Sequence, residues 1–256
     1  MNSRLSLSAV LITKNAAGRL EDCLASLAFC DEIVVVDSGS EDGTEAIARR
    51  HGARVIQSDW RGFGPQKQFA VEQASHDWVL CIDADERVSS SLQDGIRTVL
   101  AAVSPAPTSG AYRFARCNRF MGRYLRHGEG YPDWSLRLFD RRRARWSDDP
   151  VHERVIATGE IGTLQGDLLH ESAESLESYL AKQNRYSSLA ADAALASGER
   201  ATALHLVLSP LLRFVKFYVF RLGFLDGLPG LVHILIGCAA SFAKYAKMLA
   251  FQRSAQ

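Results

Sequence analysis

The first hundred residues alternate short apolar runs with segments of helical pattern, and this alternation restricts the possible folds more than any other feature. Four runs have the length and β-branched content of buried strands; they cover residues 7–12, 33–36, 55–56 and 78–82. Helix-start signals or helical spacing follow the runs, near residues 20, 41, 65 and 89. Repeated strand–helix units predict an α/β fold with a mostly parallel, doubly wound sheet flanked by helices. In such a sheet, ligands bind beyond the carboxyl ends of the strands.

The pattern changes twice along the rest of the chain. A Ser-Pro-Ala-Pro break at residues 104–107 ends the alternation, and shorter strand-like segments rich in arginine and aromatic residues follow it. Helical spacing then returns in three segments, 175–195, 203–221 and 230–251. We therefore expect a first domain over 1–172, with halves at 1–103 and 104–172, and a helical C-terminal extension over 173–256.

The net charge of +1 conceals two basic stretches. Residues 113–145 hold ten arginines against three acidic residues, and residues 201–256 hold six lysines and arginines against Asp226 alone. Such stretches favour an anionic partner, with a solvated charged surface as the alternative. No nucleic-acid-binding motif accompanies them, so no nucleic acid is expected as a partner.

Cysteine usage and hydropathy indicate a cytosolic chain. The five cysteines are scattered, odd in number and without a CxxC pair, so we expect reduced, mostly buried thiols. The N-terminus lacks the apolar centre and cleavage site of a signal peptide. The apolar stretch 228–243 contains Pro229 and His233 and falls short of the ~20 residues that a spanning helix needs. We therefore expect no segment that crosses a membrane.

Acidic residues follow two of the predicted strands. Asp37 comes after the second, and Asp83-Ala84-Asp85-Glu86 comes directly after the fourth. Two carboxylates one residue apart can hold a divalent cation, which in turn can neutralise a diphosphate leaving group; a surface turn is the alternative. The chain lacks GxGxxG after its first strand and the lysine of GxxxxGK[ST], which disfavours a dinucleotide-dependent dehydrogenase. The sequence therefore predicts a metal–diphosphate site at this edge of the sheet.

Six segments of the chain match one known family. They are Val-Leu-Ile-Thr-Lys-Asn (10–15), Val-Asp-Ser-Gly-Ser-Glu-Asp-Gly-Thr (36–44), Gly-Pro-Gln-Lys-Gln (64–68), Asp-Ala-Asp-Glu (83–86), Val-His-Glu (151–153) and Gly-Phe-Leu-Asp-Gly (223–227). Together they resemble family 2 glycosyltransferases of the GT-A fold, and among these the bacterial lipopolysaccharide inner-core β-1,4-glucosyltransferases. The resemblance covers nearly the whole chain and is strongest in its N-terminal half.

The resemblance implies a nucleotide-sugar site. Thr13, Asn15 and Asp37 would line the nucleotide pocket, with Asp37 contacting the uracil ring. Lys67 would lie near the phosphates or the ribose of the UDP-sugar, although Gln68 stands where relatives often have Asn. Asp83 would contact the ribose.

The same resemblance implies residues for the metal and the diphosphate. Asp85 would bind Mg²⁺ or Mn²⁺, with Asp83 as a further candidate ligand. Apart from the resemblance, His170 is another candidate metal ligand because imidazole suits transition metals, and a buried structural histidine is the alternative. Lys182-Gln183-Asn184-Arg185-Tyr186 resembles the Gln-x-x-Arg-Trp element of processive relatives, which implies that Arg185 helps to hold the diphosphate; Tyr186 departs from that pattern.

Inverting enzymes of this kind need one general base within hydrogen-bond reach of the acceptor hydroxyl. Apart from the metal pair, the candidates are Asp133, Asp148, Asp149 and Glu153. We favour Glu153, since Val-His-Glu matches a segment of the family, and Asp149 is second. A surface acid is the alternative for each.

The resemblance and the basic stretches together predict transfer of a hexose, with glucose from UDP-glucose favoured, to an inner-core heptose of a lipid-anchored saccharide. A polyprenyl-phosphate glycosyltransferase and a non-catalytic nucleotide-sugar-binding membrane adaptor are the alternatives. Aromatic residues beside basic ones in 213–225 suit a helix in an anionic membrane interface, with a packed helix pair as the alternative. We expect a cytoplasmic enzyme, peripheral on the cytoplasmic face of the bacterial inner membrane.

Overall fold

The computed structural model describes residues 4–101, 109–149, 153–172 and 175–254. Backbone contacts divide the chain into two compact units. The first comprises Met1–Cys117 and Asp133–Glu171, and the second comprises Asn118–Pro132 and Ser172–Gln256. The segment Asn118–Pro132 therefore belongs with the C-terminal helices, whereas the sequence pattern groups it with the first domain.

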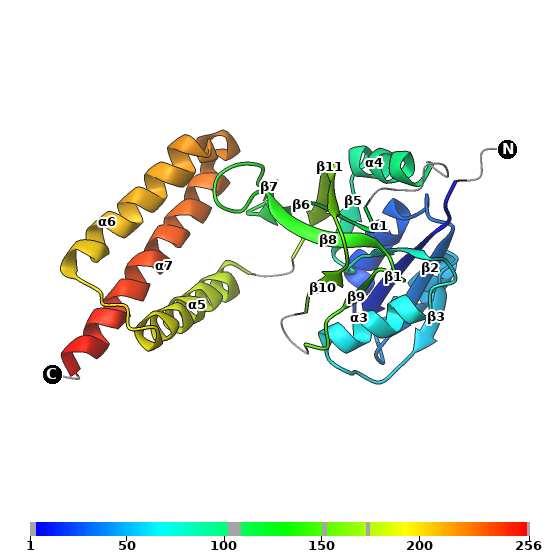
Figure 1. Cartoon of the computed structure of the whole chain (residues 1–256), viewed down its shortest axis with the longest axis horizontal. Helices are drawn as coiled ribbons and strands as arrows, with labels where there is room; N and C mark the ends of the chain where they lie inside the picture. The colour runs from blue at the N-terminus through cyan, green and yellow to red at the C-terminus, as the bar shows by residue number, and fades with distance from the viewer. Residues whose placement is uncertain (1–3, 102–108, 150–152, 173–174, 255–256) are drawn as a thin grey trace. The chain divides into compact units, whose positions relative to one another are not determined.

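The first unit is built on a mixed sheet with the strand order β3-β2-β1-β4-β8-β6-β11-β5 (Figure 1). One half is parallel: β1 (Leu7–Thr13) lies between β2 (Glu32–Asp37) and β4 (Trp78–Cys81), and β3 (Arg54–Gln57) pairs with β2. The side chains of β1 and β4 are almost all buried, as expected of strands covered on both faces. The predicted α/β sheet is confirmed, and these strands are the four that the apolar runs indicate.

The other half of the sheet is antiparallel. It consists of β8 (Asp133–Asp140), β6 (Ala111–Phe120), β11 (Ile161–His170) and β5 (Glu86–Val88). β8 runs antiparallel to β4 and to β6, and β11 runs antiparallel to β5. β9 (Ala144–Trp146) and β10 (Val155–Ala157) form a separate two-stranded sheet. The parallel pairs β1–β2, β1–β4 and β2–β3 thus belong to the segment in which strands and helices alternate.

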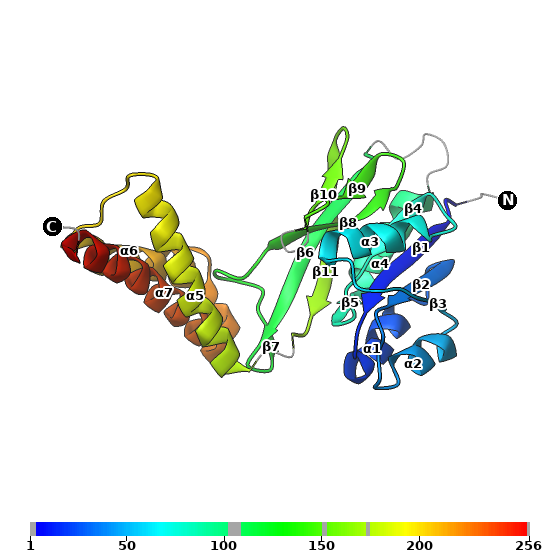
Figure 2. The ribbon, with the colours of Figure 1, turned by 90° about the horizontal axis from the view of Figure 1, so that it is seen from below.

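Each face of the sheet has its own hydrophobic core. α1 (Ala17–Ser26), α2 (Thr44–Arg50) and α4 (Ser90–Ala101) pack with Leu7, Ala9 and Leu11 of β1. α3 (Phe63–Glu72), β9 and β10 pack on the opposite face with Val10 (Figure 2). The free thiols of Cys23 and Cys81 lie in these two cores, in agreement with the expected reduced cysteines.

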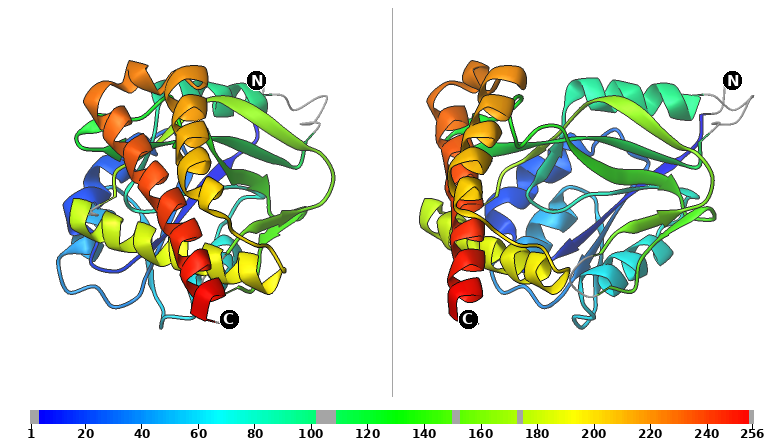
Figure 3. Two further views of the ribbon diagram at one scale, coloured as in Figure 1. Left: turned by 90° about the vertical axis from the view of Figure 1, so that its left-hand side faces the viewer. Right: turned by 60° about the vertical axis from the view of Figure 1, so that its left-hand side comes forward.

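The second unit consists mainly of three helices, α5 (Leu176–Ala196), α6 (Ala203–Phe214) and α7 (Gly227–Ser254). A π-helical turn, η1 (Val215–Phe220), continues α6, and a 3-10 turn, η2 (Gly223–Asp226), leads into α7. α7 packs along both α5 and α6 (Figure 3). The short strand β7 (Arg123–Tyr124) pairs with the end of β6.

The helix α7 is longer than the apolar stretch 228–243 that the sequence indicates. It extends over 28 residues because Pro229 lies in its first turn, where a missing backbone N–H breaks no helical hydrogen bond. By length and composition, both Ala203–Phe220 and Gly223–Ser254 could cross a membrane, each with a mean hydropathy of 1.5. The two segments differ in burial. No residue is buried in the apolar window of Ala203–Phe220, whereas 22% of the apolar window of Gly223–Ser254 is buried.

Candidate active site

The ends of β1 and β2 meet at the carboxyl edge of the sheet, where Thr13 is paired with Asp37. Asp37 is fully buried, and its carboxylate accepts hydrogen bonds from Thr13 Oγ1 at 2.7 Å and Ser40 Oγ at 2.6 Å. The backbone N–H groups of Gly39 and Ser40 also donate to it, at 3.1 and 2.8 Å. The structure therefore brings Thr13 and Asp37 together and shows that Asp37 orders the loop after β2.

Asn15 joins the loops that follow β1 and β2. Its φ of +52° lies in the left-handed region, which asparagine tolerates better than most residues. The side-chain carbonyl accepts the backbone N–H of Glu41 at 2.9 Å, and the backbone N–H of Asn15 donates to Ser40 Oγ at 2.8 Å. These contacts fix the two loops against each other and preform the wall on which the nucleotide is expected to bind.

Lys67 connects the metal-motif aspartate to the favoured general base. Lys67 lies in the middle of α3, and only 7% of this charged residue is exposed. Its Nζ lies 3.0 Å from Asp83 Oδ1 and donates to Glu153 Oε1 at 2.9 Å. The same ammonium lies 4.8 Å from the centroid of the Trp146 ring, a favourable cation–π position. The fold thus brings two predicted site residues, Asp83 and Glu153, into contact with the buried ammonium of a third, Lys67.

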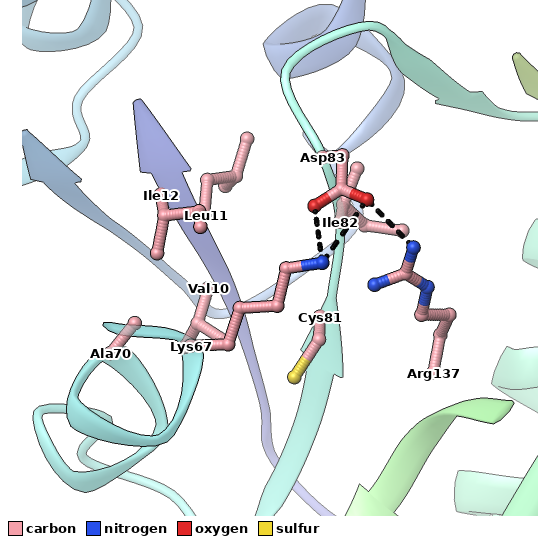
Figure 4. Close-up of a pocket in the computed structure, with 9 residues that line it drawn as sticks. All are labelled: Val10, Leu11, Ile12, Lys67, Ala70, Cys81, Ile82, Asp83 and Arg137. Atoms are coloured by element: carbon pink, nitrogen blue, oxygen red, sulfur yellow. Dashed lines mark hydrogen bonds and ion pairs between the residues drawn. The ribbon is translucent and has the colours of Figure 1, made fainter. Parts of the chain in front are cut away.

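Arg137 is a site residue that the sequence did not single out. Its Nη2 donates to Asp83 Oδ2 at 2.7 Å and to Glu86 Oε1 at 3.4 Å, and only 7% of its side chain is exposed (Figure 4). β8 carries a bulge at this residue, because Leu136 and Leu138 face the consecutive residues Arg113 and Tyr112 of β6. A bulge redirects a side chain, and this one coincides with the contact between Arg137 and Asp83.

The protonation preferences of this cluster follow from burial and charge. Burial disfavours the charged form of Asp83, but Arg137 and Lys67 outweigh it and hold the pKa of Asp83 well below its usual range. For the fully buried Glu86, burial prevails and raises the pKa, although Arg137 opposes the shift. Glu86 also accepts the backbone N–H of Asp83 at 3.0 Å. Arg137 and Lys67 therefore favour the ionised form of Asp83 and contact both of its carboxylate oxygens.

The small cavity beside this cluster is too small for a sugar. Figure 4 shows Lys67, Asp83 and Arg137 converging on it, with apolar side chains of β1 and β4 around them. Its volume of about 10 Å³ corresponds to a single water molecule. This cavity therefore cannot hold a nucleotide sugar.

Asp85 and His170 form the part of the site that suits a metal. His170 ends β11, and its Nε2 lies 3.3 Å from Asp85 Oδ2; both side chains are partly exposed. The backbone carbonyl of Asp85 accepts the N–H of Glu171 at 2.9 Å, which fixes the turn. Carboxylate and imidazole together suit Mn²⁺, and Mg²⁺ is commonly held by one or two carboxylates plus substrate phosphates.

The described part of the chain contains no group of three or more residues that could enclose a metal without help from a substrate. Asp83 fits a metal less well than Asp85, because Lys67 and Arg137 already contact both of its carboxylate oxygens. The pair Asp85 and His170 thus fits a cation whose remaining ligands come from phosphate and water.

Asp149 and Arg185 are two further residues that the sequence predicts for the site. Asp149 is exposed, and its backbone carbonyl accepts the N–H of Gly64 at 3.2 Å. Gly64 is required there, since a Cβ would lie 2.5 Å from the carbonyl oxygen of Asp149. Residues 150–152, which come directly before the favoured base Glu153, lie outside the described residues. Arg185 is exposed on α5, in the second unit, so its role toward the diphosphate stays a prediction.

Comparison with known proteins identifies the group to which these features correspond. The sequence profile of the family described as "Glycosyl transferase family 2" matches residues 8–155. A Rhizobium meliloti protein named lipopolysaccharide core biosynthesis glycosyltransferase LpsC is 35% identical, over 100% of this chain and 95% of that protein. An uncharacterized glycosyltransferase of Rickettsia typhi is 31% identical, over 94% and 86%.

A solved structure agrees in fold. The mannosyltransferase PcManGT of Pyrobaculum calidifontis, solved in complex with GDP-Man and Mn²⁺, superimposes with a TM-score of 0.51 at 18% identity. The superposition covers 96% of this chain and 88% of that one. At this identity the likeness concerns the fold alone, and it confirms the GT-A-like architecture expected from the sequence.

Proposed function

Because the chain belongs to glycosyl transferase family 2, we propose that it is an inverting hexosyltransferase that moves glucose from UDP-glucose to an inner-core heptose of lipopolysaccharide. One observation carries the chemical part of this proposal. The buried Lys67 contacts both Asp83 and Glu153 at the carboxyl edge of the sheet. Asp83 is two positions before the partly exposed Asp85 in the sequence. The family and the similarity to LpsC support the substrate class.

Glu153 is the proposed general base. The acceptor hydroxyl oxygen forms a bond to the anomeric carbon as the bond from that carbon to the diphosphate oxygen breaks, and the hydroxyl proton passes to Glu153. Lys67 donates to Glu153 Oε1, so we assign the proton to Oε2. A carboxylate fixed through one oxygen presents the other in a defined direction, which is what a base aimed at one hydroxyl requires.

The opposite end of the site is proposed to bind the nucleotide. Thr13, Asn15 and Asp37 form the wall for uridine, and Asp83, kept ionised by its two cations, accepts hydrogen bonds from the ribose hydroxyls. Mg²⁺ or Mn²⁺, held by Asp85 with His170, would neutralise the charge that develops on the diphosphate.

The acceptor and the location are inferred from charge and similarity. The exposed arginines of 113–145, which do not include the buried Arg137, suit an acceptor that carries phosphates and carboxylates, and LpsC supports a lipopolysaccharide core. A lipid-anchored acceptor places the reaction at the cytoplasmic face of the inner membrane, and we assign the anionic membrane surface as the partner of region 173–256.

A panel of nucleotide sugars with two acceptors tests the proposal. Purified enzyme is given UDP-glucose, UDP-galactose or GDP-mannose, with either truncated lipopolysaccharide or polyprenyl phosphate, in Mn²⁺, Mg²⁺ or EDTA. We expect transfer from UDP-glucose to lipopolysaccharide that EDTA abolishes. Transfer only to polyprenyl phosphate would establish the alternative acceptor, and nucleotide-sugar binding without any turnover would establish the adaptor.

A further inference from the structure

The helix α6 presents an apolar stripe to solvent. Five of its residues are between 40% and 65% exposed: Leu204, Val207, Leu208, Leu211 and Leu212. Their spacing of i, i+3, i+4, i+7 and i+8 places them on one face of the helix. No residue of α6 is buried. A globular protein normally turns such a stripe toward its core, so the exposed stripe identifies a docking surface.

The opposite face of α6 makes polar and aromatic contacts with α7. Ser209 Oγ lies 2.8 Å from Ser241 Oγ, and the His205 ring stacks on Tyr245 with 5.0 Å between ring centroids. Polar side chains thus face the neighbouring helix while leucines face outward. In a soluble protein the leucines would face the neighbouring helix and the polar side chains would face water. The reverse is expected of a helix whose outward face contacts lipid, because lipid chains are as apolar as leucine.

Charge near the stripe complements an anionic surface. Within 201–254, the only acidic residue is Asp226, which is 2% exposed and accepts the backbone N–H groups of Arg126 and His127. Exposed cations in the same range include Lys216, Arg221 and Arg253. Anionic headgroups that contact 201–254 would therefore meet exposed basic residues and no exposed carboxylate.

We propose that the outward face of α6, with the adjoining Phe220, Phe224 and Leu225, lies in the plane of an anionic bilayer and docks the enzyme there. These three side chains are 77%, 45% and 47% exposed. An in-plane orientation is favoured over a spanning one because α7 packs on α5, which exposes Glu177, Arg185 and Asp192. This docking surface rests on the proposed function only in that a lipid-anchored acceptor gives the enzyme a reason to bind the membrane.

Vesicle binding by matched variants tests the surface. The full chain is sedimented with phosphatidylethanolamine–phosphatidylglycerol vesicles or with phosphatidylcholine vesicles. We expect wild type to bind the anionic vesicles, the double variant Leu208→Glu/Leu211→Glu to bind more than about tenfold more weakly, and Leu189→Glu to bind like wild type. Leu189 is a matched control because it is as exposed as Leu211, at 53%, but lies on α5.

Three outcomes would overturn the surface assignment. They are wild type that stays in solution, a double variant that binds as well as wild type, and wild type that is a dimer without lipid while the double variant is a monomer. The last outcome would mean that a second copy covers the stripe. Turnover of UDP-glucose with a detergent-dispersed acceptor is measured in parallel, so that loss of docking is distinguished from failure of the proposed reaction.

Fluorescence quenching provides a second test that needs no destabilising charge. Leu204→Trp and Leu211→Trp are compared in vesicles that contain lipids brominated at shallow or deep acyl positions, after subtraction of the wild-type signal. An in-plane helix predicts the same depth for both tryptophans. A spanning helix would place them about 10 Å apart in depth, because seven residues rise 1.5 Å each, and that result would contradict the proposal.

Discussion

The two units depart from ordinary burial in opposite ways. The first unit buries charge: Lys67, Arg137 and Glu86 are almost fully enclosed around Asp83. The second unit exposes apolar surface: the leucines of α6 face solvent while its serine and histidine face α7. Isolated charges are costly inside a protein, and large apolar stripes are costly outside it. The difference indicates two separate tasks, chemistry on a charged donor in one unit and attachment to lipid in the other.

Asp85 tests the charged side of this comparison with the largest expected effect. Asp85→Ala should reduce the turnover of UDP-glucose by roughly a thousandfold, since several kcal/mol of charge stabilisation at the diphosphate would be lost. The free energy of unfolding should change little, because Asp85 is partly exposed. Asp94→Ala, on the exposed side of α4, is the control and should have normal turnover. Full activity of Asp85→Ala would contradict the proposal that Asp85 binds a catalytic metal ion.

Arg137 tests whether the buried charge also stabilises the fold. Arg137→Met leaves Asp83 with Lys67 alone, and breaking a buried ion pair typically costs about 3–5 kcal/mol. Chemical denaturation should show this loss, and UDP binding should weaken because Asp83 is less firmly oriented. The control, Arg113→Met on the neighbouring strand β6, removes an exposed guanidinium that stacks on Trp134. Equal stability of the two variants would contradict a special role for the Arg137 contacts.

The contribution of His170 is expected to be smaller. His170→Ala should raise the Mn²⁺ concentration needed for half-maximal activity by about tenfold, with a near-normal rate at saturating metal, if the imidazole assists Asp85. His51→Ala, at the end of α2 and facing Glu21, is the control. An unchanged metal requirement would leave His170 with a structural role only.

Glu32 shows that a charged contact in the first unit can serve the fold alone. Burial disfavours its charge, but hydrogen bonds from Ser8, Ser75 and Arg54 lower its pKa from 4.5 to about 2. A lowered pKa in the folded state contributes stability above pH 4.5 that is lost as the pH falls toward 2. The thermal midpoint should therefore fall over this range more steeply in wild type than in Glu32→Gln. Parallel curves for the two proteins would contradict this contribution.

The parallel half of the sheet could be predicted because its strands are buried on both faces. Runs such as Ile33-Val34-Val35-Val36 are typical of strands buried on both faces, and the rule for strand ends then located Asp37, Asp83 and Asp85 at one edge. The resemblance added Lys67 and Glu153, which lie 86 positions apart and whose contact no local pattern contains.

The remaining features depend on long-range pairing. The bulge that coincides with the Asp83 contact of Arg137 exists only because β8 is paired with β6, and an arginine between two leucines gave no sign of it. Glu86 was visible in the Asp-Ala-Asp-Glu segment, but its complete burial depends on the packing of β5, a strand of three residues. The helix α7 was predicted over 230–251, but the length of its apolar part was underestimated because Pro229 and His233 interrupt the apolar pattern without interrupting the helix.

The most direct test of the central claim is a comparison of binding and turnover in Glu153→Gln. Glutamine keeps the size of the side chain and can still accept a hydrogen bond from Lys67, but it cannot take a proton. We predict that calorimetry shows UDP binding within about threefold of wild type, while transfer falls by roughly a hundredfold or more; Asp149→Asn should retain transfer. Near-normal transfer by Glu153→Gln would contradict the assignment of Glu153 as the base, and with it the chemistry proposed for this site.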